Sequence, residues 1–348
     1  MKQVGVAILG GSGYGAGETL RLLTHHPDAE VVCVVSSGSA GREISEAHPQ
    51  LRGFYDGAFA DDVDWDALCA YRDRVLISAQ PNGVSGKQVA ELAPMCRERG
   101  VRVIDLSGDL RLADPETHRL HYPESPLEQT LRQQVVYGLP ELAREQVRAA
   151  RVVANPGCLA TACILAAAPF ASAVRGRIVF DAKTGSSGAG KSPRETTHHP
   201  VRHSNFFAYK PLTHQHEPEI VQALTRVAGS APECVFVPQS MAVSRGIYVT
   251  AHMMLADTLG AASATARVTD FYANSPFVRV CDSPPELQNV VGSNFCDIGV
   301  ATRGNHLVVM AALDNLVKGM CGTAIQNLNL MCGLPETTGL WHPGWRPV

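Results

Sequence analysis

The stretch VGVAILGGSGYGAG, residues 4–17, decides the fold of the first half of the chain. Its opening part, VGVAILG, is a continuous apolar run, which is typical of a parallel strand buried on both faces. The glycines that follow predict a tight turn, and the helical pattern AGETLRLLTHHP then carries three leucines and stops at Pro27. Because AEVVCVVSS, residues 29–37, has the pattern of a second strand, these segments predict a βαβ unit.

Strand and helix patterns keep alternating after this unit. RVLISA (74–79) and VRVIDLS (101–107) are strand candidates, and the helical pattern SGKQVAELAPMCRERG separates them. Alternation of this kind predicts an α/β fold with a doubly wound parallel sheet of the Rossmann type.

The character of the chain changes near residue 155. Strands rich in β-branched residues follow with few helices between them, namely RIVFDAKTG, ECVFVPQSMAVSR, IYVTAHMML and LVVMAALDN. They predict an α+β domain whose antiparallel or mixed sheet is covered by one or two helices. The last helical pattern, NLVKGMCGTAIQNLNLMCGL, is closed by Gly333 and Pro335 and is long enough to pack back on the first domain.

The length of 348 residues suits two hydrophobic cores, because single cores stop growing at roughly 250 to 300 residues. We therefore predict one domain from residues 1–155 with 316–348, which binds a dinucleotide. The second domain, residues 156–315, is predicted to carry the catalytic groups.

Composition excludes several classes of partner. The formal net charge is only −3, so the chain lacks the basic surface that gathers nucleic acid. Its most apolar later stretch, ACILAAAPFASAV, is interrupted by Pro169 and falls short of the ~20 residues of a membrane span. The amino terminus has no signal-peptide pattern, and ten cysteines without a CxxC pair suit thiols kept reduced. We expect a cytoplasmic protein.

The glycine turn, residues 10–17, is placed to hold a pyrophosphate. Its glycines let the backbone approach the ligand, and the next helix presents free N–H groups to it. A plain strand–helix turn is the alternative. An NAD site usually ends the second strand with Asp or Glu, but Ser36 and Ser37 stand here with Arg42 close behind. Hydroxyls with an arginine favour the 2′-phosphate of NADP(H), unless Arg42 is only a solvated loop charge.

The segment ANPGCLAT, residues 154–161, places a cysteine at a helix start. Pro156 and Gly157 suit a sharp turn, and Cys158 then faces the unsatisfied N–H groups of the first turn. This position favours an ionised, nucleophilic sulfur. Alternatively, Cys158 is one more buried small residue, like Cys163 on the same helix. A nucleophilic cysteine that follows a nicotinamide-binding domain in the chain indicates acyl transfer coupled to hydride transfer.

An acid/base group is expected in YKPLTHQHEPEI, residues 209–220. His214 and His216 lie two apart and would share one side of an extended strand, with Glu217 and Glu219 near enough to orient an imidazole. A surface loop is one alternative. A zinc site built with His198 and His199 is another, although the usual Cys/His pair spacings are missing, and we predict no metal.

Several motifs, in order along nearly the whole chain, resemble those of the N-acetyl-γ-glutamyl-phosphate reductases of arginine biosynthesis, relatives of aspartate-semialdehyde dehydrogenases. GGSGYGAG resembles the family's GASGYTG, and DLSGDLRL (105–112) resembles DLSADFRL. YGLPEL (137–142) matches as written. The remaining motifs are ANPGCLAT around the nucleophile, SGAGK (187–191) and GLPETTGL (333–340).

The resemblance implies that Cys158 is the nucleophile and that His214 or His216 is the acid/base group. It implies a mixed α/β catalytic domain inserted before a carboxy-terminal helix, and a homodimer or homotetramer paired through that domain's sheet. The cofactor contacts predicted from the turn and implied by the resemblance are Gly10, Ser12, Gly13, Tyr14, Gly15, Ser187, Gly188, Ala189, Gly190 and Asn315.

Two departures from the family pattern concern the substrate. The family's His-Arg-His is His214-Gln215-His216 here, which questions any contact made by that arginine. The segment TTHHPVRHSNFFAYKP (196–211) looks more like the branch that reduces aminoadipyl or glutamyl phosphates carried on a small acidic protein. A basic patch facing such a carrier would be made by Arg194, His198, His199, Arg202, His203 and Lys210. Solvated loop charges are the alternative, and we expect the free acyl phosphate.

The predicted mechanism starts with attack of the Cys158 thiolate on the acyl phosphate, while N–H groups near Asn155 and the helix start stabilise the oxyanion. Lys210 or hydroxyls such as that of Ser186 would hold the leaving phosphate, and Arg245 would bind the substrate carboxylate. NADPH then reduces the thioester, and His216, with His214 in reserve, moves the proton. A redox sensor that binds NADP without turnover is the competing hypothesis.

Overall fold

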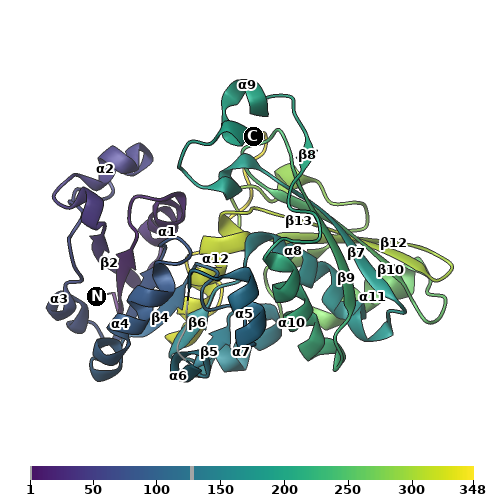
Figure 1. Cartoon of the computed structure of the whole chain (residues 1–348), viewed down its shortest axis with the longest axis horizontal. Coiled ribbons are helices and arrows are strands. Elements are labelled where there is room, and N and C mark those ends of the chain that lie inside the picture. Colours follow the sequence, from purple (N-terminus) through teal and green to yellow (C-terminus); the bar gives the residue numbers. More distant parts are fainter. Residues whose placement is uncertain (1, 126–128) are drawn as a thin grey trace. The chain divides into compact units, whose positions relative to one another are not determined.

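The computed structural model describes residues 2–125 and 129–348 (Figure 1). The chain divides into two compact units, each of which is described by itself. The first is Met1–Pro156 with Met320–Trp341, and the second is Gly157–Gly319 with His342–Val348. Residues 316–319 and 342–348, which the sequence pattern placed in the first domain, thus group with the second unit. Within the described residues, no helix combines the length and the apolar character needed to cross a bilayer.

The first unit is built on a six-stranded sheet whose neighbouring strands are all parallel, in the order β2-β1-β3-β4-β6-β5. The βαβ unit predicted at the amino terminus is confirmed, because β1 pairs with β2 on one side and with β3 on the other. The strands are β1 (Val4–Leu9), β2 (Ala29–Val35), β3 (Asp73–Ser78), β4 (Arg102–Asp105), β5 (Val135–Tyr137) and β6 (Val152–Ala154).

Helices flank this sheet. The longer ones are α1 (Tyr14–Thr24), α4 (Ser85–Glu98), α7 (Pro140–Ala149) and α12 (Gly322–Met331), and the shorter ones are α2 (Ile44–Ala47), α3 (Trp65–Cys69), α5 (Pro115–His121) and α6 (Gln129–Arg132). Every residue of β1 is buried, which explains its continuous apolar run. Strand β1 lies between β2 and β3, and the strand order turns there. Ligands of such sheets bind beyond the carboxyl ends of the strands at this point.

Helix α12 is buried along its whole length, so the amides in its sequence need partners inside the first unit. Asn329 lies 2.8 Å from Nε2 of His26, and Asn327 donates to the carbonyl of Gly138 at 2.9 Å. A short π-helical turn, Val317–Cys321, precedes α12. The predicted carboxy-terminal helix is therefore a ten-residue helix with a distorted start rather than one long helix.

The second unit carries a seven-stranded sheet in the order β11-β12-β13-β10-β7-β9-β8. Strand β10 runs antiparallel to β7 and β13, whereas β7 pairs in parallel with β9, and β11 with β12. The strands are β7 (Arg177–Thr184), β8 (Phe207–Ala208), β9 (Glu233–Ser240), β10 (Ile247–Met254), β11 (Val278–Val280), β12 (Cys296–Arg303) and β13 (His306–Leu313).

Three helices of ten or more residues cover one face of this sheet (Figure 1), where the sequence pattern suggested one or two: α8 (Cys158–Ala167), α10 (His216–Ala228) and α11 (Ala261–Phe271). Helix α9 (His199–Arg202) is one turn. The prediction of a purely antiparallel sheet is wrong. Helix α10 lies between β7 and β9 in the chain, and the connection that contains it lets these two strands run parallel. The α+β class with a mixed sheet is confirmed.

Candidate functional site

The glycine turn after β1 has the backbone that a phosphate site needs. Gly10 has φ +75°, and a Cβ there would lie 2.9 Å from the carbonyl of Ala79, so only glycine fits. Gly13 caps α1, and a Cβ built on it would meet no atom nearer than 3.9 Å. The first turn of α1 contains no acidic side chain. An open, positively polarised helix start therefore follows the strand at the turning point of the sheet.

The two serines and the arginine singled out from the sequence follow the end of β2. Ser36 donates its backbone N–H to Ala60, and Ser37 opens a 3₁₀ turn that ends at Ser39. Arg42 pairs with Glu46 through Nε and Nη2 at 2.9 and 2.7 Å, with both side chains well exposed. An exposed pair of this kind is worth at most ~1 kcal/mol, so a phosphate could take the place of the carboxylate. Ser12 and Tyr14 lie at the start of α1.

Asn155, predicted as a catalytic residue, is a buried structural residue of the first unit. Its backbone N–H donates to the carbonyl of Asp105 at 2.8 Å. Its side-chain amide donates to the carbonyl of Met320 at 3.0 Å, and its Oδ1 accepts from Asn327 at 3.1 Å. The carbonyl of Asn155 in turn accepts from Nε of Arg111. These groups are thus hydrogen-bonded inside the protein, and the role of N–H groups near Asn155 in stabilising an oxyanion stays a prediction.

Cys158 is the first residue of α8, as predicted, with Gly157 as the N-cap. The backbone N–H of Gly157 donates to Oε1 of Glu219 at 2.6 Å, and Glu219 is fully buried in the first turn of α10. Cys158 is half-buried, whereas Cys163 is enclosed and burial raises the pKa of its thiol well above the usual value. The side chain of Cys158 is therefore the accessible sulfur of this helix.

The position of the Cys158 thiol requires a glycine at residue 319, which the sequence alone did not reveal. A Cβ on Gly319 would lie 2.7 Å from Cβ of Cys158, closer than such atoms ever approach. The glycine precedes the unit boundary in the motif LDNLVKG, and its N–H donates to the carbonyl of Asp314 at 2.8 Å. The segment after β13 therefore passes directly against Cys158.

His214 and His216 lie side by side, but the segment is not extended. Gln215 has helical backbone angles and His216 begins α10. The two rings meet edge to face with their centroids 4.6 Å apart, and Nδ1 of His214 accepts the backbone N–H of His216 at 3.1 Å. Burial, then the charges of His216 and Lys210, lower the pKa of His214 to about 3. His214 is therefore neutral near pH 7 and serves as a fixed acceptor at the start of α10.

Tyr209 is a neighbour of this pair that sequence reasoning did not single out. Its ring meets that of His214 edge to face at 5.6 Å. Burial raises the pKa of its hydroxyl, the charge of Cys158 raises it further, and that of Arg202 lowers it. Tyr209 thus lies within electrostatic reach of the thiol and of an arginine from α9.

The SGAG loop and Asn315 come together within the second unit. Asn315 donates to Oγ of Ser187 at 2.9 Å and accepts the N–H of Gly246 at 2.7 Å. Backbone bonds from Ser186 to Val243 and from Ser187 to Ser244 complete this connection. The predicted cofactor-contact residues of this unit therefore form one structured loop: Ser187, Gly188, Ala189 and Gly190, with Ser186 and Asn315 beside them.

Arg245, predicted to bind the substrate carboxylate, already has neighbours of its own. Its Nη1 lies 3.6 Å from Oδ2 of the buried Asp314, and its guanidinium packs 5.3 Å from the ring centre of Trp345. Lys210 is exposed, with φ +46°, and its charge helps to lower the pKa of His214. Lys210 is thus near the histidine pair.

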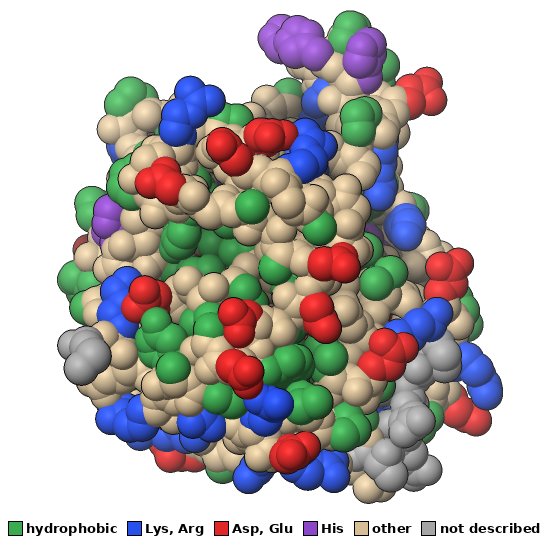
Figure 2. Space-filling model, turned by 90° about the vertical axis from the view of Figure 1, so that its left-hand side faces the viewer, with side chains coloured by type: hydrophobic (Ala, Val, Ile, Leu, Met, Phe, Trp, Pro, Cys, Tyr) green, Lys and Arg blue, Asp and Glu red, His purple; other side chains and the backbone are tan. Residues whose placement is uncertain are grey.

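The basic patch predicted for residues 194–210 is not a continuous surface. Arg194, His198, His199 and His203 are exposed, with the rings of His199 and His203 stacked at 5.2 Å. Figure 2 shows histidine side chains gathered at the top of the view, where Figure 1 places α9. Arg202, by contrast, is turned inward and only 7% exposed.

The four histidines of the zinc alternative do not converge, because two are exposed near α9 and two are buried at the start of α10. Among residues 2–125 and 129–348, no group of three or more His, Cys, Asp or Glu side chains is arranged to hold a metal ion.

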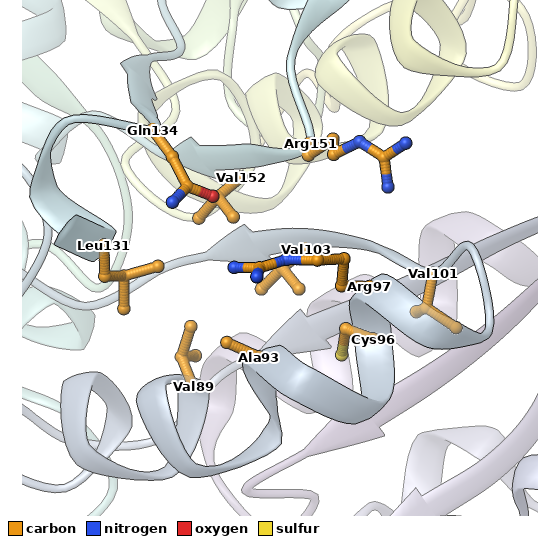
Figure 3. Close-up of a pocket in the computed structure, with 10 residues that line it drawn as sticks. All are labelled: Val89, Ala93, Cys96, Arg97, Val101, Val103, Leu131, Gln134, Arg151 and Val152. Carbon is orange, nitrogen blue, oxygen red and sulfur yellow. The ribbon is translucent and has the colours of Figure 1, made fainter.

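A pocket in the first unit contains none of the predicted site residues. Figure 3 shows Val89 and Ala93 of α4 facing Val103 of β4 and Val152 of β6. Burial raises the pKa of Cys96, which also lines the pocket, to about 11. A mostly aliphatic lining with a protonated thiol indicates a packing gap rather than a reaction site.

Comparisons with known proteins agree with both units. Residues 5–150 match the family "Semialdehyde dehydrogenase, NAD binding domain", and residues 158–315 match "Semialdehyde dehydrogenase, dimerisation domain". Among solved structures, aspartate semialdehyde dehydrogenase II of Vibrio cholerae, complexed with ASA, superimposes with a TM-score of 0.69 at 18% identity. The match covers 96% of this chain and 99% of that one. At that identity it shows the fold.

Two curated relatives are much closer in sequence. The N-acetyl-gamma-glutamyl-phosphate reductase of Methanoregula boonei is 44% identical over 349 residues, which cover 98% of this chain and 99% of the relative. The protein of the same name from Methanothrix thermoacetophila is 42% identical over 352 residues, or 99% and 100% of the two chains. An NAD(P)-binding unit and a helix-start thiol are thus joined in one chain, which belongs to the N-acetyl-gamma-glutamyl-phosphate reductase family of oxidoreductases.

Proposed function

We propose that the chain reduces N-acetyl-γ-glutamyl phosphate with NADPH and releases phosphate and the semialdehyde, as in arginine biosynthesis. One observation carries the proposal. The hydrogen bond from Gly157 to Glu219 joins the start of the helix that begins with Cys158 to the first turn of the helix that begins with His216. A nucleophile and a proton carrier are thereby held at neighbouring helix starts.

The first step is acyl transfer to the thiol. The thiolate sulfur of Cys158 forms a bond to the acyl carbon, the bond from that carbon to the phosphate oxygen breaks, and phosphate leaves with the electron pair. The oxyanion donors are the first-turn N–H groups of α8, from residues such as Leu159 and Ala160, because the first N–H groups of a helix have no acceptor within it. The N–H groups of Asn155 and Gly157 are already used.

The second step returns the thiol. A nicotinamide cofactor, when bound, would supply the hydride that reduces the thioester carbon. His216 protonates the resulting oxygen, and then takes that proton back as the carbon–sulfur bond breaks and the aldehyde leaves. His214 holds the helix start in place and remains neutral throughout.

For the cofactor we propose NADP(H) bound at Gly10, Ser12, Gly13, Tyr14 and Gly15. The open helix start at Gly13 supports a pyrophosphate there. The 2′-phosphate would be held by Ser36, Ser37 and Arg42, with Arg42 exchanging Glu46 for the phosphate. An Arg42→Gln variant should raise the KM for NADP by about tenfold and leave that for NAD unchanged, since one charge-assisted pair is at stake. Equal changes for both cofactors would refute the assignment.

The nicotinamide side of the cofactor is assigned to the SGAG loop. Ser187, Gly188, Ala189 and Gly190 are fixed by Asn315, which ties the loop to the turn at Gly246. Ser186 and Lys210 remain candidates for the leaving phosphate, and Arg245 for the carboxylate. These roles are proposed from the positions of the three residues within the second unit.

The free acyl phosphate is the proposed substrate, and a carrier-bound aminoadipyl or glutamyl phosphate is the second candidate. The exposed histidines around α9 favour the second, because they could face an acidic carrier protein. Comparing the rates with the two acyl phosphates separates them. A cytoplasmic location remains a prediction.

Pairing of subunits through the second sheet is proposed because the outward side chains of β10 are partly or fully exposed while alternate residues are buried. A matched dimerisation domain supports this assembly.

The reverse reaction tests the function. Protein, NADP, inorganic phosphate and N-acetylglutamate semialdehyde should give absorbance of reduced cofactor, and the signal should depend on phosphate. Cys158→Ser should abolish it while cofactor binding persists, and Cys163→Ser, on the same helix, is the matched control with activity retained. Absence of a phosphate-dependent signal in the wild type would instead favour a redox sensor that binds NADP.

A further inference from the structure

Arg202 is a buried guanidinium with one edge left without a hydrogen-bond partner in the described residues. It is the last residue of α9 and only 7% exposed. Its Nη1 donates to Oγ of Ser240, at the end of β9. Its Nε and Nη2 are enclosed and have no hydrogen-bond partner among residues 2–125 and 129–348. A charged donor left in this state is costly, so the site is built for a partner that the chain itself does not supply.

The nearby charges do not provide that partner. Burial lowers the pKa of Arg202, and the group whose field opposes this is the hydroxyl of Tyr209, which burial keeps protonated. Asp181, next to β9 in the sheet, is already bonded to Lys183 and to Gln239. An anion from outside the chain would therefore meet a positive, dehydrated edge without competition from a carboxylate.

Tyr209 connects this edge to the reaction centre. Its hydroxyl responds to the charges of both Arg202 and Cys158, and its ring packs on His214. The guanidinium of Arg202 and the thiol of Cys158 thus both act on the same tyrosine hydroxyl.

We propose that the Nε and Nη2 edge of Arg202 binds an oxyanion of the substrate through two parallel hydrogen bonds, either its carboxylate or the phosphate that leaves. The inference rests on the proposed function. This edge of a guanidinium matches the two oxygens of a carboxylate or phosphate. Arg202 is then a substrate-binding residue, which the sequence pattern had placed on the outer surface as part of a patch for a carrier protein.

The reverse reaction distinguishes the two anions, because phosphate and semialdehyde are separate substrates there. Arg202→Met should raise one KM by about ten- to a hundredfold, since a bidentate charged contact is lost. A rise in the KM for inorganic phosphate identifies the phosphate, and a rise in that for the semialdehyde identifies the carboxylate. Arg202→Lys, which keeps the charge and loses the fork, should show a smaller rise in the same constant.

Arg175→Met is the matched control, because this arginine of the same unit is exposed and both KM values should stay unchanged. A folded Arg202→Met protein with both KM values within twofold of the wild type overturns the proposal. If neither Arg202 variant folds, wild-type crystals soaked in phosphate or N-acetylglutamate decide. An anion on Nε and Nη2 supports the inference, and anions bound only elsewhere overturn it.

Failure of the proposed function has a different signature. In that case the wild type shows no phosphate-dependent reduction of NADP at all. Titration of the wild type and of Arg202→Met with inorganic phosphate and with N-acetylglutamate, followed by thermal shift, then still tests the edge. Loss of the shift in the variant supports anion binding, and equal shifts in both proteins overturn it.

Discussion

Replacing His214 by Asn tests which histidine carries the proton. Nδ1 of His214 accepts the N–H of His216, and Oδ1 of an asparagine can occupy the same place. Because the pKa of His214 is lowered to about 3, its ring cannot exchange a proton near pH 7. We expect His214→Asn to keep kcat within about tenfold, whereas His216→Asn should lose on the order of 10²- to 10⁴-fold, the usual share of general acid–base catalysis.

The same substitution has a calculable effect on stability. The pKa of His214 is about 3 in the folded protein and 6.5 in the unfolded chain. The stability that comes from keeping this ring neutral is therefore fully present above pH 6.5 and is lost as the pH falls toward 3. Each pH unit in this window costs about 1.4 kcal/mol, so lowering the pH from 7 to 5 should cost about 2 kcal/mol through this one group. The asparagine variant lacks this contribution.

Urea unfolding at pH 5, 6, 7 and 8 measures the difference. The free energy of unfolding of His214→Asn should fall by about 2 kcal/mol less than that of the wild type between pH 7 and 5. His26→Asn is the control for a buried histidine of the first unit, whose pKa burial also lowers, and it should leave kcat unchanged. An unchanged pH slope in His214→Asn would refute the buried neutral ring. A kcat as low as that of His216→Asn would refute the assignment of His216.

Substitutions at three further positions test the scaffold of the site. Gly319→Ala should lower kcat at least tenfold while cofactor affinity is unchanged, because its methyl group would lie 2.7 Å from Cβ of Cys158. Glu219→Ala should destabilise the protein by about 1.5–3 kcal/mol, the value of a hydrogen bond to a charged group. Glu219→Gln should keep most of this stability, because its amide oxygen can still accept the N–H of Gly157. Equal losses of stability in the two variants would contradict the role of this hydrogen bond. Gly10→Ala should weaken NADP binding tenfold or more in a direct titration, since φ +75° and the contact with Ala79 exclude a Cβ, and unaltered binding would contradict the assigned turn.

Local patterns predicted the parts of the site that depend on one segment. The strand, glycine turn and helix at residues 4–24 follow from a buried apolar run and from glycines that a side chain would obstruct. Cys158 at a helix start follows from the Asn-Pro-Gly turn before it. The shortest strands, β5, β6, β8 and β11, were missed because two or three residues show no periodicity, and β12 because a glycine interrupts its pattern.

Contacts between distant segments were not predictable in this way. Glu219 was expected to orient an imidazole, and its carboxylate also accepts the N–H of Gly157, 62 positions earlier, which no local pattern indicates. Arg202 lies among exposed neighbours in the sequence, and only the packing of α9 near β9 turns it inward. Such choices depend on which elements meet in space, which a single sequence does not specify.

The motif DLSGDLRL shows why a family motif need not touch the substrate. Asp109 accepts the N–H groups of Gly83 and Gly86, so its charge caps the start of α4. Arg111 donates to the carbonyls of Leu106 and Asn155, so its charge fixes the backbone of the residue three places before the nucleophile. The other end of that turn is fixed inside the second unit, where Glu219 holds Gly157. Each unit thus holds its own end of the ANPGC segment. A substitution in this motif should therefore lower kcat by disturbing the backbone at Asn155, three residues before Cys158 in the chain.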